Sequence, residues 1–385
     1  MPLQFLLRVL ANLISIAILV AAGYLLWSWW DGDLVRQTDG SVVRIREDWQ
    51  LWVGLAALAF SFLGKPLVVP VLAGADKEPT KPVRGNGTLI DAPNGTQLYV
   101  EETGVTGGET IILTHGWSMD STIWNYAKRD LGQQFRVVSW DLPGLGKSRG
   151  PISLEAFAAD LAAVIAWTGA PRVVLVGHSI GGMTIQTLAR DHAALFATKV
   201  AGVVLVNTTY TNPLKTMVLP RFMQALRFPV LEPLMKLTKW LLPLSQLSAW
   251  QSYLSGTAHM ANRLGFGKYV TRSQLDHTTL LSTRNSQAAI ADGNLAMFRW
   301  DATGATAKLQ VPVLVLAGAA DIVTKPIASQ TIAGYTPTAT LQEIEGVNHM
   351  GFLERADVYN PAIADFATGA FALGHPGASV MSSLG

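Results

Sequence analysis

The chain has 385 residues, of which 49% are hydrophobic, so it can bury one large core or two small ones and does not have the composition of a disordered chain. Its 29 basic and 27 acidic residues leave a net charge of +2 with no basic stripe, which argues against a nucleic-acid partner. The absence of cysteine from the sequence excludes disulfides, thiolate metal sites and a cysteine nucleophile.

The first predicted element is a membrane-spanning helix over residues 9–30. This stretch carries no charge, and its length fits the roughly 20 residues that cross about 30 Å of hydrocarbon. It ends in Tyr24 and three tryptophans, an arrangement typical of a membrane–water interface. A cleaved signal peptide is the alternative, although the apolar core of such a peptide is usually only about 7 to 15 residues long.

A second apolar block covers residues 49–74 and is interrupted by Lys65 and Pro66. We expect it to cross the membrane with a kink near Pro66, or else to lie at the interface as a partner of the first helix. Residues 1–74 are therefore a predicted membrane anchor of one or two transmembrane helices, with the lipid bilayer as its partner.

Charge around the two apolar blocks predicts their orientation. The segment between the blocks is slightly acidic, whereas basic residues such as Arg8, Lys77 and Arg84 flank their outer ends. If both blocks cross, the positive-inside rule places the remaining domain on the cytoplasmic side of the membrane. If only the first block crosses, the same rule places the domain on the other side.

Residues 75–87 mix charges with Pro and Gly and are predicted to be a linker. Beyond them, residues 88–210 and 308–373 alternate apolar runs with helical segments. The runs of strand length include "TIILTHG", "FRVVSWDLPG", "RVVLVGHS", "VAGVVLVNTT" and "VPVLVLAGAAD". One helix is expected between the N-cap Ser153 and Gly169. Strands that are apolar on both faces and separated by helices predict a parallel sheet covered on both sides.

Residues 211–307 interrupt this alternation and are predicted to form a helical cap. Prolines break them into short amphipathic segments, which also carry Arg221, Arg227, Lys236 and Lys239. Such segments can pack on the domain beneath them or rest on anionic lipid headgroups, and the sequence leaves both open. Residues 374–385 are predicted to be a flexible tail.

A nucleophile is predicted at Ser179, in the stretch "VLVGHSIGGMT". A strand precedes this serine and a helix follows it, and Gly177 and Gly181 stand where a side chain would collide with neighbouring backbone. Such a strained turn points the hydroxyl outward. An ordinary turn serine is the alternative, because the G-x-S-x-G pattern also occurs by chance.

A serine hydroxyl needs a base, and the base needs a carboxylate that orients it. His349, in "EGVNHMGFLE", is expected in a loop after a C-terminal strand, and Asp321, in "VLAGAADIVTKP", directly follows another strand. The carboxyl ends of such strands face the ligand crevice of an open α/β sheet. Ser179, Asp321 and His349 are therefore the predicted catalytic residues. The alternatives are a helix N-cap for Asp321 and a packed or surface position for His349.

The oxyanion formed in acyl transfer needs two backbone donors. The N–H of Ile180, directly after the nucleophile, is one candidate. The N–H of Trp117, in "LTHGWSMDSTIW", is the other, because Gly116 lets the backbone approach closely. His115 is expected to have a structural role, and His178 is expected to point away from the site.

The motifs "HGW", "DLPGLGKS", "GHSIGG", "AGAAD" and "GVNHMGFLE" together resemble those of the α/β-hydrolase superfamily, from about residue 88 to about residue 373. The serine esterases, monoacylglycerol lipases and perhydrolases are its most similar members. The resemblance implies an eight-stranded, mostly parallel sheet with helices on both faces and a cap inserted after the sixth strand. It also implies acyl-enzyme chemistry without a cofactor or a metal ion.

The sequence thus predicts a membrane-anchored serine esterase or lipase that acts on a small-molecule ester or lipid. Medium to long acyl chains are expected, because the cap is apolar and the anchor holds the enzyme among lipids. A carbon–carbon bond hydrolase or a thioesterase with the same triad is an alternative, and a tethered binding protein without activity is another. The sequence carries no signal for the oligomeric state.

Overall fold

The structure is a computed structural model that describes residues 2–373. Its centre is an eight-stranded sheet with the strand order β10-β9-β8-β7-β5-β6-β4-β3. The strands are β3 (Gly87–Ala92), β4 (Thr96–Gly104), β5 (Thr110–Thr114), β6 (Arg136–Trp140), β7 (Val173–His178), β8 (Val200–Val206), β9 (Val313–Gly318) and β10 (Ala339–Ile344). Neighbouring strands from β10 to β6 are parallel, whereas β4 pairs antiparallel with both β6 and β3.

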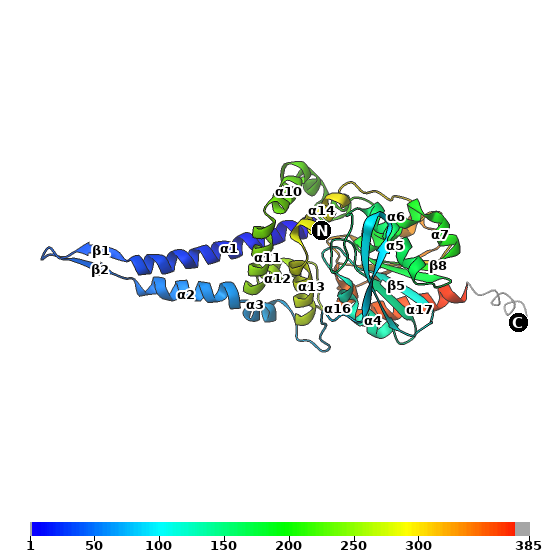
Figure 1. Cartoon of the computed structure of the whole chain (residues 1–385), viewed down its shortest axis with the longest axis horizontal. Helices are drawn as coiled ribbons and strands as arrows, with labels where there is room; N and C mark the ends of the chain where they lie inside the picture. The colour runs from blue at the N-terminus through cyan, green and yellow to red at the C-terminus, as the bar shows by residue number, and fades with distance from the viewer. Residues whose placement is uncertain (1, 374–385) are drawn as a thin grey trace, which may run out of the picture.

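Both faces of this sheet are covered, because its central strands are apolar at almost every position. In β9, Val313 and Val315 belong to the hydrophobic core on one face, and Leu314 and Leu316 belong to the core on the other. Helices α5 (Leu154–Trp167) and α6 (Ile180–Asp191) pack on the first face, and α4 (Asn125–Leu131) and α17 (Ala356–Ala372) pack on the second (Figure 1). The predicted fold class is confirmed.

Shorter helices complete this part of the chain: η1 (Pro93–Gly95), η2 (Ser121–Trp124), α7 (Ala193–Thr198), α15 (Pro326–Tyr335) and α16 (Gly351–Glu354). The predicted start of α5 is confirmed, since the hydroxyl of Ser153 accepts a hydrogen bond from the N–H of Ala156 at 3.1 Å.

The segment between β8 and β9 forms the cap. It contains α8 (Pro213–Thr216), α9 (Pro220–Ala225), η3 (Arg227–Leu231), α10 (Glu232–Trp240), α11 (Leu242–Ser255), α12 (Thr257–Arg263), α13 (Arg272–Arg284) and α14 (Gln287–Met297). Prolines lie in the first turns of α8, α9, α10 and α11, where a missing N–H costs the helix nothing. Prolines therefore stand at the start of four of the cap helices. The cap follows β8, which is the sixth strand of the sheet along the chain, as expected.

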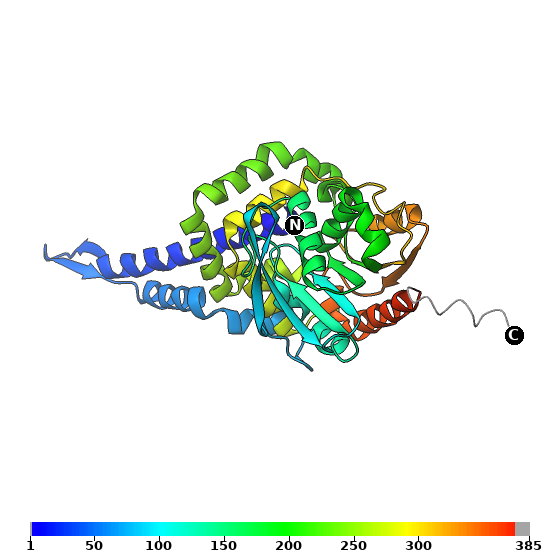
Figure 2. The same ribbon diagram turned by 45° about the vertical axis from the view of Figure 1, so that its right-hand side comes forward.

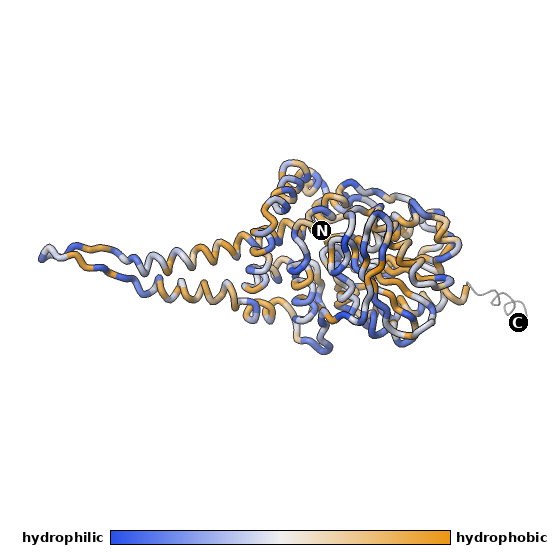
Figure 3. Tube along the Cα trace, in the orientation of Figure 1, coloured by the Kyte–Doolittle hydropathy of each residue, from blue (hydrophilic) through white to orange (hydrophobic). Residues whose placement is uncertain are grey.

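The N-terminal segment forms a helical hairpin that projects from the cap (Figures 1 and 2). Its helices are α1 (Pro2–Asp31) and α2 (Asp48–Leu63), and its tip is a two-stranded sheet of β1 (Asp33–Arg36) and β2 (Val42–Ile45). Hydrophobic residues cover most of the hairpin between tip and cap (Figure 3). Within the described residues, Leu3–Asp31 is long and apolar enough to cross a membrane alone.

The second apolar block is bent. Helix α3 (Lys65–Leu72) follows α2 at an angle of 65°. The bend lies at Gly64, next to the predicted kink, and it lets α3 run along the cap. A Cβ at Gly64 would lie only 2.5 Å from the carbonyl oxygen of Ser255 in α11, so a glycine is needed at this approach.

The first half of α1 and the predicted linker both pack on the cap, which a membrane anchor and a linker do not require. In the first half of α1, Phe5 is buried with cap residues, and the Ser15 hydroxyl lies 2.7 Å from that of Ser255. In the predicted linker, Asp76 accepts a hydrogen bond from the N–H of Ser273 at 2.9 Å. The predicted tail, residues 374–385, lies outside the described part of the chain.

Candidate active site

Ser179 lies on the turn between β7 and α6, with φ 55° and ψ −117°. This backbone conformation is rare for a residue with a side chain, and it stores strain. Two glycines make the turn possible. A Cβ at Gly177 would lie 2.5 Å from the backbone of Gly181, and a Cβ at Gly181 would lie 2.3 Å from the carbonyl oxygen of Thr114. These are the collisions that the sequence pattern predicted.

The three predicted catalytic side chains form one hydrogen-bonded chain. The Nε2 atom of His349 lies 3.0 Å from the Oγ of Ser179, and its Nδ1 lies 2.9 Å from the Oδ2 of Asp321. Each residue follows the carboxyl end of a parallel strand, which is where open α/β sheets bind ligands. Ser179, Asp321 and His349 are 2%, 3% and 2% exposed. The base is thus within proton-transfer distance of the hydroxyl, in a site that is largely shielded from water.

The environment of Asp321 favours its ionised form. Burial opposes ionisation, but the adjacent imidazole of His349, the N–H of Thr324 and the amide of Asn207 lower the pKa of Asp321 below its usual value. Its Oδ1 also accepts the N–H groups of Val323 and Thr324 at 2.7 and 2.9 Å. Asp321 therefore contacts the histidine and also holds the start of the following turn.

Asn207 holds Asp321 in place and was missed by the sequence reasoning. Its Nδ2 donates to Asp321 Oδ2 at 3.0 Å, and its Oδ1 accepts from the Tyr359 hydroxyl at 3.0 Å. Asn207 directly follows β8, just as Ser179 directly follows β7, and Asp321 comes three residues after the end of β9. This placement is the signal that could have identified it.

The two candidate oxyanion donors follow two neighbouring strands of the sheet. Ile180 is the first residue of α6, and Trp117 lies in the loop after β5, the strand beside β7. Among residues 2–373, no acceptor pairs with the backbone N–H of either residue. Free N–H groups at the start of a helix are suited to binding negative charge. The indole of Trp117 is fixed, since its Nε1 donates to the carbonyl of Ile290 at 3.0 Å.

Two further histidines support the site. The Nε2 of His115 accepts the N–H of Leu142 at 3.0 Å, which is the structural role that the sequence predicted. His178 lies behind His349: its Nε2 is 3.0 Å from the His349 carbonyl oxygen, and the two rings are 4.9 Å apart. Burial lowers the pKa values of His115 and His178, so both are neutral at pH 7.

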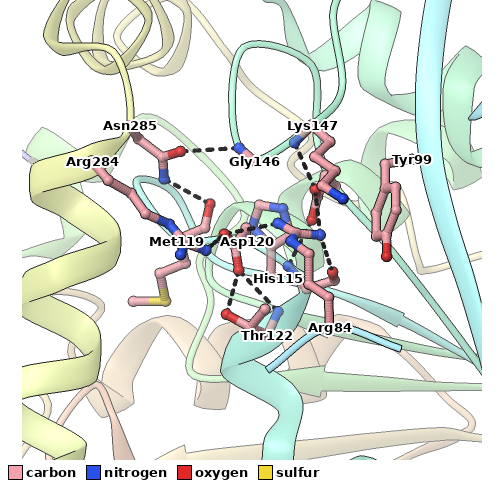
Figure 4. A network of polar contacts seen from close by, with 12 residues as sticks. Arg84, Tyr99, His115, Met119, Asp120, Thr122, Gly146, Lys147, Arg284 and Asn285 are labelled. Carbon is pink, nitrogen blue, oxygen red and sulfur yellow. Dashed lines mark hydrogen bonds and ion pairs between the residues drawn. The ribbon is translucent and has the colours of Figure 1, made fainter. Parts of the chain in front are cut away.

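A buried ionic network holds the loop after β5 (Figure 4). Arg84, from the predicted linker, lies 2.9 Å from a carboxylate oxygen of both Asp120 and Asp141. Arg284, at the end of α13, also pairs with Asp120. Burial opposes ionisation of Asp120, but the two arginines lower its pKa to about 2. The network thus ties the linker and the cap to the loop that carries Trp117.

An amide adds a second link between the cap and this loop. The Nδ2 of Asn285 donates to the carbonyl oxygens of Ser118 and Met119 at 3.1 and 3.2 Å, and its Oδ1 accepts the N–H of Gly146 at 3.0 Å. These supporting residues were not predicted. Asp141 directly follows β6, so its position after a strand was again an available signal.

Comparisons with known proteins identify the family of the chain. The family described as alpha/beta hydrolase fold matches residues 109–356. A non-heme chloroperoxidase of Streptomyces lividans is 27% identical over 282 residues, which cover 72% of this chain and 98% of that protein. A pimeloyl-[acyl-carrier protein] methyl ester esterase of Sodalis glossinidius is 38% identical over 114 residues, which cover 28% of this chain and 40% of that protein.

Solved structures share the fold. An esterase from Exiguobacterium antarcticum matches with a TM-score of 0.59 at 20% identity, covering 74% of this chain and 100% of that one. An enol-lactonase from Burkholderia xenovorans matches with a TM-score of 0.54 at 22% identity, covering 73% of this chain and 100% of that one. Residues 1–108, which include the hairpin, the predicted linker and strands β3 and β4, precede the part that the family matches.

Proposed function

The chain belongs to the alpha/beta hydrolase fold family, and from this premise we propose that it is a membrane-anchored serine hydrolase that cleaves carboxylic esters with hydrophobic acyl groups. The observation that carries the proposal is the hydrogen-bonded chain from Ser179 through His349 to Asp321. The similarity to a methyl ester esterase over 114 residues also supports it.

In the proposed reaction, His349 takes the proton from Ser179 as the Oγ atom attacks the ester carbonyl carbon. The N–H groups of Trp117 and Ile180 stabilise the oxyanion. The alcohol leaves with the proton from His349, and the same imidazole then activates the water that releases the acid and restores the serine. Asp321 remains ionised, orients the imidazole and stabilises its charged form.

The nucleophile can be tested directly. Ser179→Ala removes the attacking oxygen, so hydrolysis of p-nitrophenyl octanoate by the full chain should fall by about 10⁴-fold or more. Ser41→Ala, at the exposed tip of the hairpin, is the matched control and should keep the wild-type rate. A fluorophosphonate probe should label the wild type but not Ser179→Ala. Retention of most of the rate in Ser179→Ala would refute the proposal, and an unlabelled wild type would favour a binding protein without activity.

The acyl specificity is a second prediction. Exposed apolar side chains of the cap, such as Phe222, Phe228 and Trp240, suit a lipid-like environment. We expect the specificity constant for p-nitrophenyl esters to rise from acetate to octanoate by about tenfold or more, because each buried CH₂ contributes about 0.8 kcal/mol. Faster cleavage of acetate than of octanoate would contradict this. Octanoyl thioesters, tested in parallel, should be cleaved more slowly than octanoyl esters, and the opposite order would favour a thioesterase.

A further inference from the structure

A cavity of about 330 Å³ lies between the N-terminal helix and the cap. Its walls come from the first half of α1, from α10 and α11, and from α12 and α14, and it reaches Ser118 in the loop after β5. Ser179 does not line it, but Ser118 is adjacent in the chain to the proposed oxyanion donor Trp117. The volume lies within the range of small-molecule sites in proteins. The predicted anchor is therefore also a wall of a cavity.

Arg8 lies in this wall without a counter-ion. Its side chain is buried, and one guanidinium nitrogen donates to the carbonyl oxygen of Ser282 at 2.8 Å. No carboxylate of the described residues lies within 4 Å of the guanidinium. The half-buried Arg84, by contrast, contacts two carboxylates. Burying an unpaired charge is costly, so the free N–H groups of Arg8 favour an anionic ligand in the cavity.

A second polar group in the same wall also lacks a partner. The Oδ1 of Asn294 is buried and accepts no hydrogen bond within the described part of the chain, although its Nδ2 donates to the carbonyl of Ile290 at 2.9 Å. Buried acceptors are normally paired. A hydroxyl of a ligand, or a water molecule that accompanies it, would satisfy this one.

The rim of the cavity is apolar and exposed. Leu13 of α1 and Leu244 of α11 are 59% and 62% exposed, and both line the cavity. Leu13 lies two residues before Ser15, beyond which α1 projects, and α11 contacts the hairpin helix α2. The cavity thus combines a buried cation with an apolar rim, which is the complement of an amphiphile with one anionic group.

The length of the hairpin places this rim near the membrane. Beyond Ser15, whose hydroxyl contacts the cap, residues 16–30 of α1 extend roughly 22 Å at 1.5 Å per residue. Helix α2, with 16 residues, is roughly 24 Å long. Both are shorter than the ~30 Å hydrocarbon layer of a bilayer. If the hairpin crosses such a layer completely, the rim of the cavity must lie at the surface of the hydrocarbon.

We propose that this cavity binds a single-chain anionic amphiphile that enters from the bilayer, with its carboxylate or phosphate on Arg8 and its alkyl chain along the rim. The inference deepens the proposed function, on which it rests for the identity of the ligand: an acidic substrate lipid or the released fatty acid. Arg8 is a binding residue in this proposal, and the first half of α1 is part of the binding site.

The test uses the full-length Ser179→Ala chain in phosphatidylcholine nanodiscs, so that no probe is consumed. Dodecanoate, dodecyl phosphate and dodecanol compete with a fluorescent polyene fatty acid. Arg8→Gln should raise the dissociation constant of the charged probes about tenfold or more, because a charge-assisted hydrogen bond is lost, and should change that of dodecanol by less than about twofold. Arg221→Gln, at an exposed position in the cap, is the matched control and should change neither.

The location is tested by filling the cavity from either wall. Val9→Trp on α1 and Leu241→Trp at the start of α11 should each weaken binding of all three probes. If only one of the two variants folds, its result is enough to test the location. Tighter binding of dodecanoate identifies the released acid as the ligand, and tighter binding of dodecyl phosphate identifies a lipid headgroup. Unchanged anion binding in Arg8→Gln, or equal affinity of the wild-type site for dodecanol and dodecanoate, would overturn the inference.

Hydrolysis of p-nitrophenyl octanoate by the chain with Ser179 intact reports separately on the proposed function. Hydrolysis without anion binding would refute the cavity proposal alone, and anion binding without hydrolysis would refute the esterase proposal alone.

Discussion

Single residues set the position of the loop that carries Trp117. Gly293, on α14, faces the indole of Trp117, and a Cβ at Gly293 would lie 2.0 Å from ring atom Cζ2. The indole is held from the same helix, since its Nε1 donates to the carbonyl of Ile290. A cap helix therefore determines where the ring lies, and with it the backbone N–H that we assign to the oxyanion.

Gly293→Ala should impair catalysis by displacing Trp117. We expect kcat for p-nitrophenyl octanoate to fall roughly ten- to hundredfold, somewhat less than the loss of a whole oxyanion donor. Gly334→Ala on α15 is the matched control, because its added Cβ would have no neighbour within 4 Å. Alanine also favours a helix over glycine, so the control should be at least as stable as the wild type. Equal kcat in both variants would show that the ring position does not matter.

The residues of the site differ in how far the sequence could predict them. Ser179 was predictable because the sequence shows glycine at 177 and 181, the two positions where a Cβ would collide with neighbouring backbone. Asp321 and His349 were predictable from their places after strands. Asn207 carried the same signal, since it directly follows β8, but Asp120 and Asn285 did not, because their contacts come from segments far apart in the chain. Asn285, for example, bonds to the carbonyl of Ser118, 167 residues away.

At the scale of elements, His277 links three parts of the structure. It projects from α13, its Nδ1 lies 3.0 Å from the hydroxyl of Thr80 in the predicted linker, and its Nε2 lies 3.1 Å from that of Thr122 in η2. Burial lowers the pKa of His277 to about 4. The neutral ring therefore joins cap, linker and core.

This histidine should make the fold acid-sensitive. An unfolded histidine titrates near pH 6.5 and the folded one only near 4, so between these values the unfolded chain binds the extra proton. Stability is thus lost as the pH falls from about 6.5 to 4, by up to roughly 3 kcal/mol. His277→Gln should reduce the fall in Tm over this range by roughly 5 °C, whereas His192→Gln, at an exposed position, should keep the wild-type slope. If Tm fell with pH equally in the wild type, His277→Gln and His192→Gln, His277 would not be the source of the acid sensitivity.

The order of strands and helices in the core was predictable, because each strand is a short apolar run bounded by turn residues. The packing of the first half of α1 on the cap was not. Residues 9–30 carry no charge, and an uncharged apolar segment of this length is expected both where lipid covers a helix and where protein covers it. Only the polar groups on one side, such as Asn12 and Ser15, distinguish the two, and they bond to Ser252 and Ser255 of the cap.

At the scale of the whole molecule, the hairpin separates its tip from the catalytic part. Exposed tryptophans gather near the tip on both helices: Trp27 and Trp30 on α1, and Trp49 and Trp52 on α2. Tryptophan prefers the interface between lipid and water. In the proposed membrane arrangement, we therefore expect one interface at the tip end of the hairpin and the other at the cap.

This arrangement predicts that tip and catalytic part lie on opposite sides of the membrane. The sequence has no cysteine, so single cysteines can be introduced without a background. In sealed vesicles that expose the tip, a membrane-impermeant maleimide should label Thr38→Cys at once and label Lys199→Cys, before β8, only after detergent is added. Labelling of both in sealed vesicles would show that the hairpin does not cross.

The short projecting length of the hairpin has a kinetic consequence. If the cavity rim is held against the bilayer, as we propose, the protein would meet a lipid-soluble substrate as a mole fraction of the surrounding lipid, in two dimensions. The amount of substrate per volume of buffer would then have little influence on the rate. Adding inert phosphatidylcholine to vesicles at a constant amount of substrate would slow turnover simply by diluting the surface.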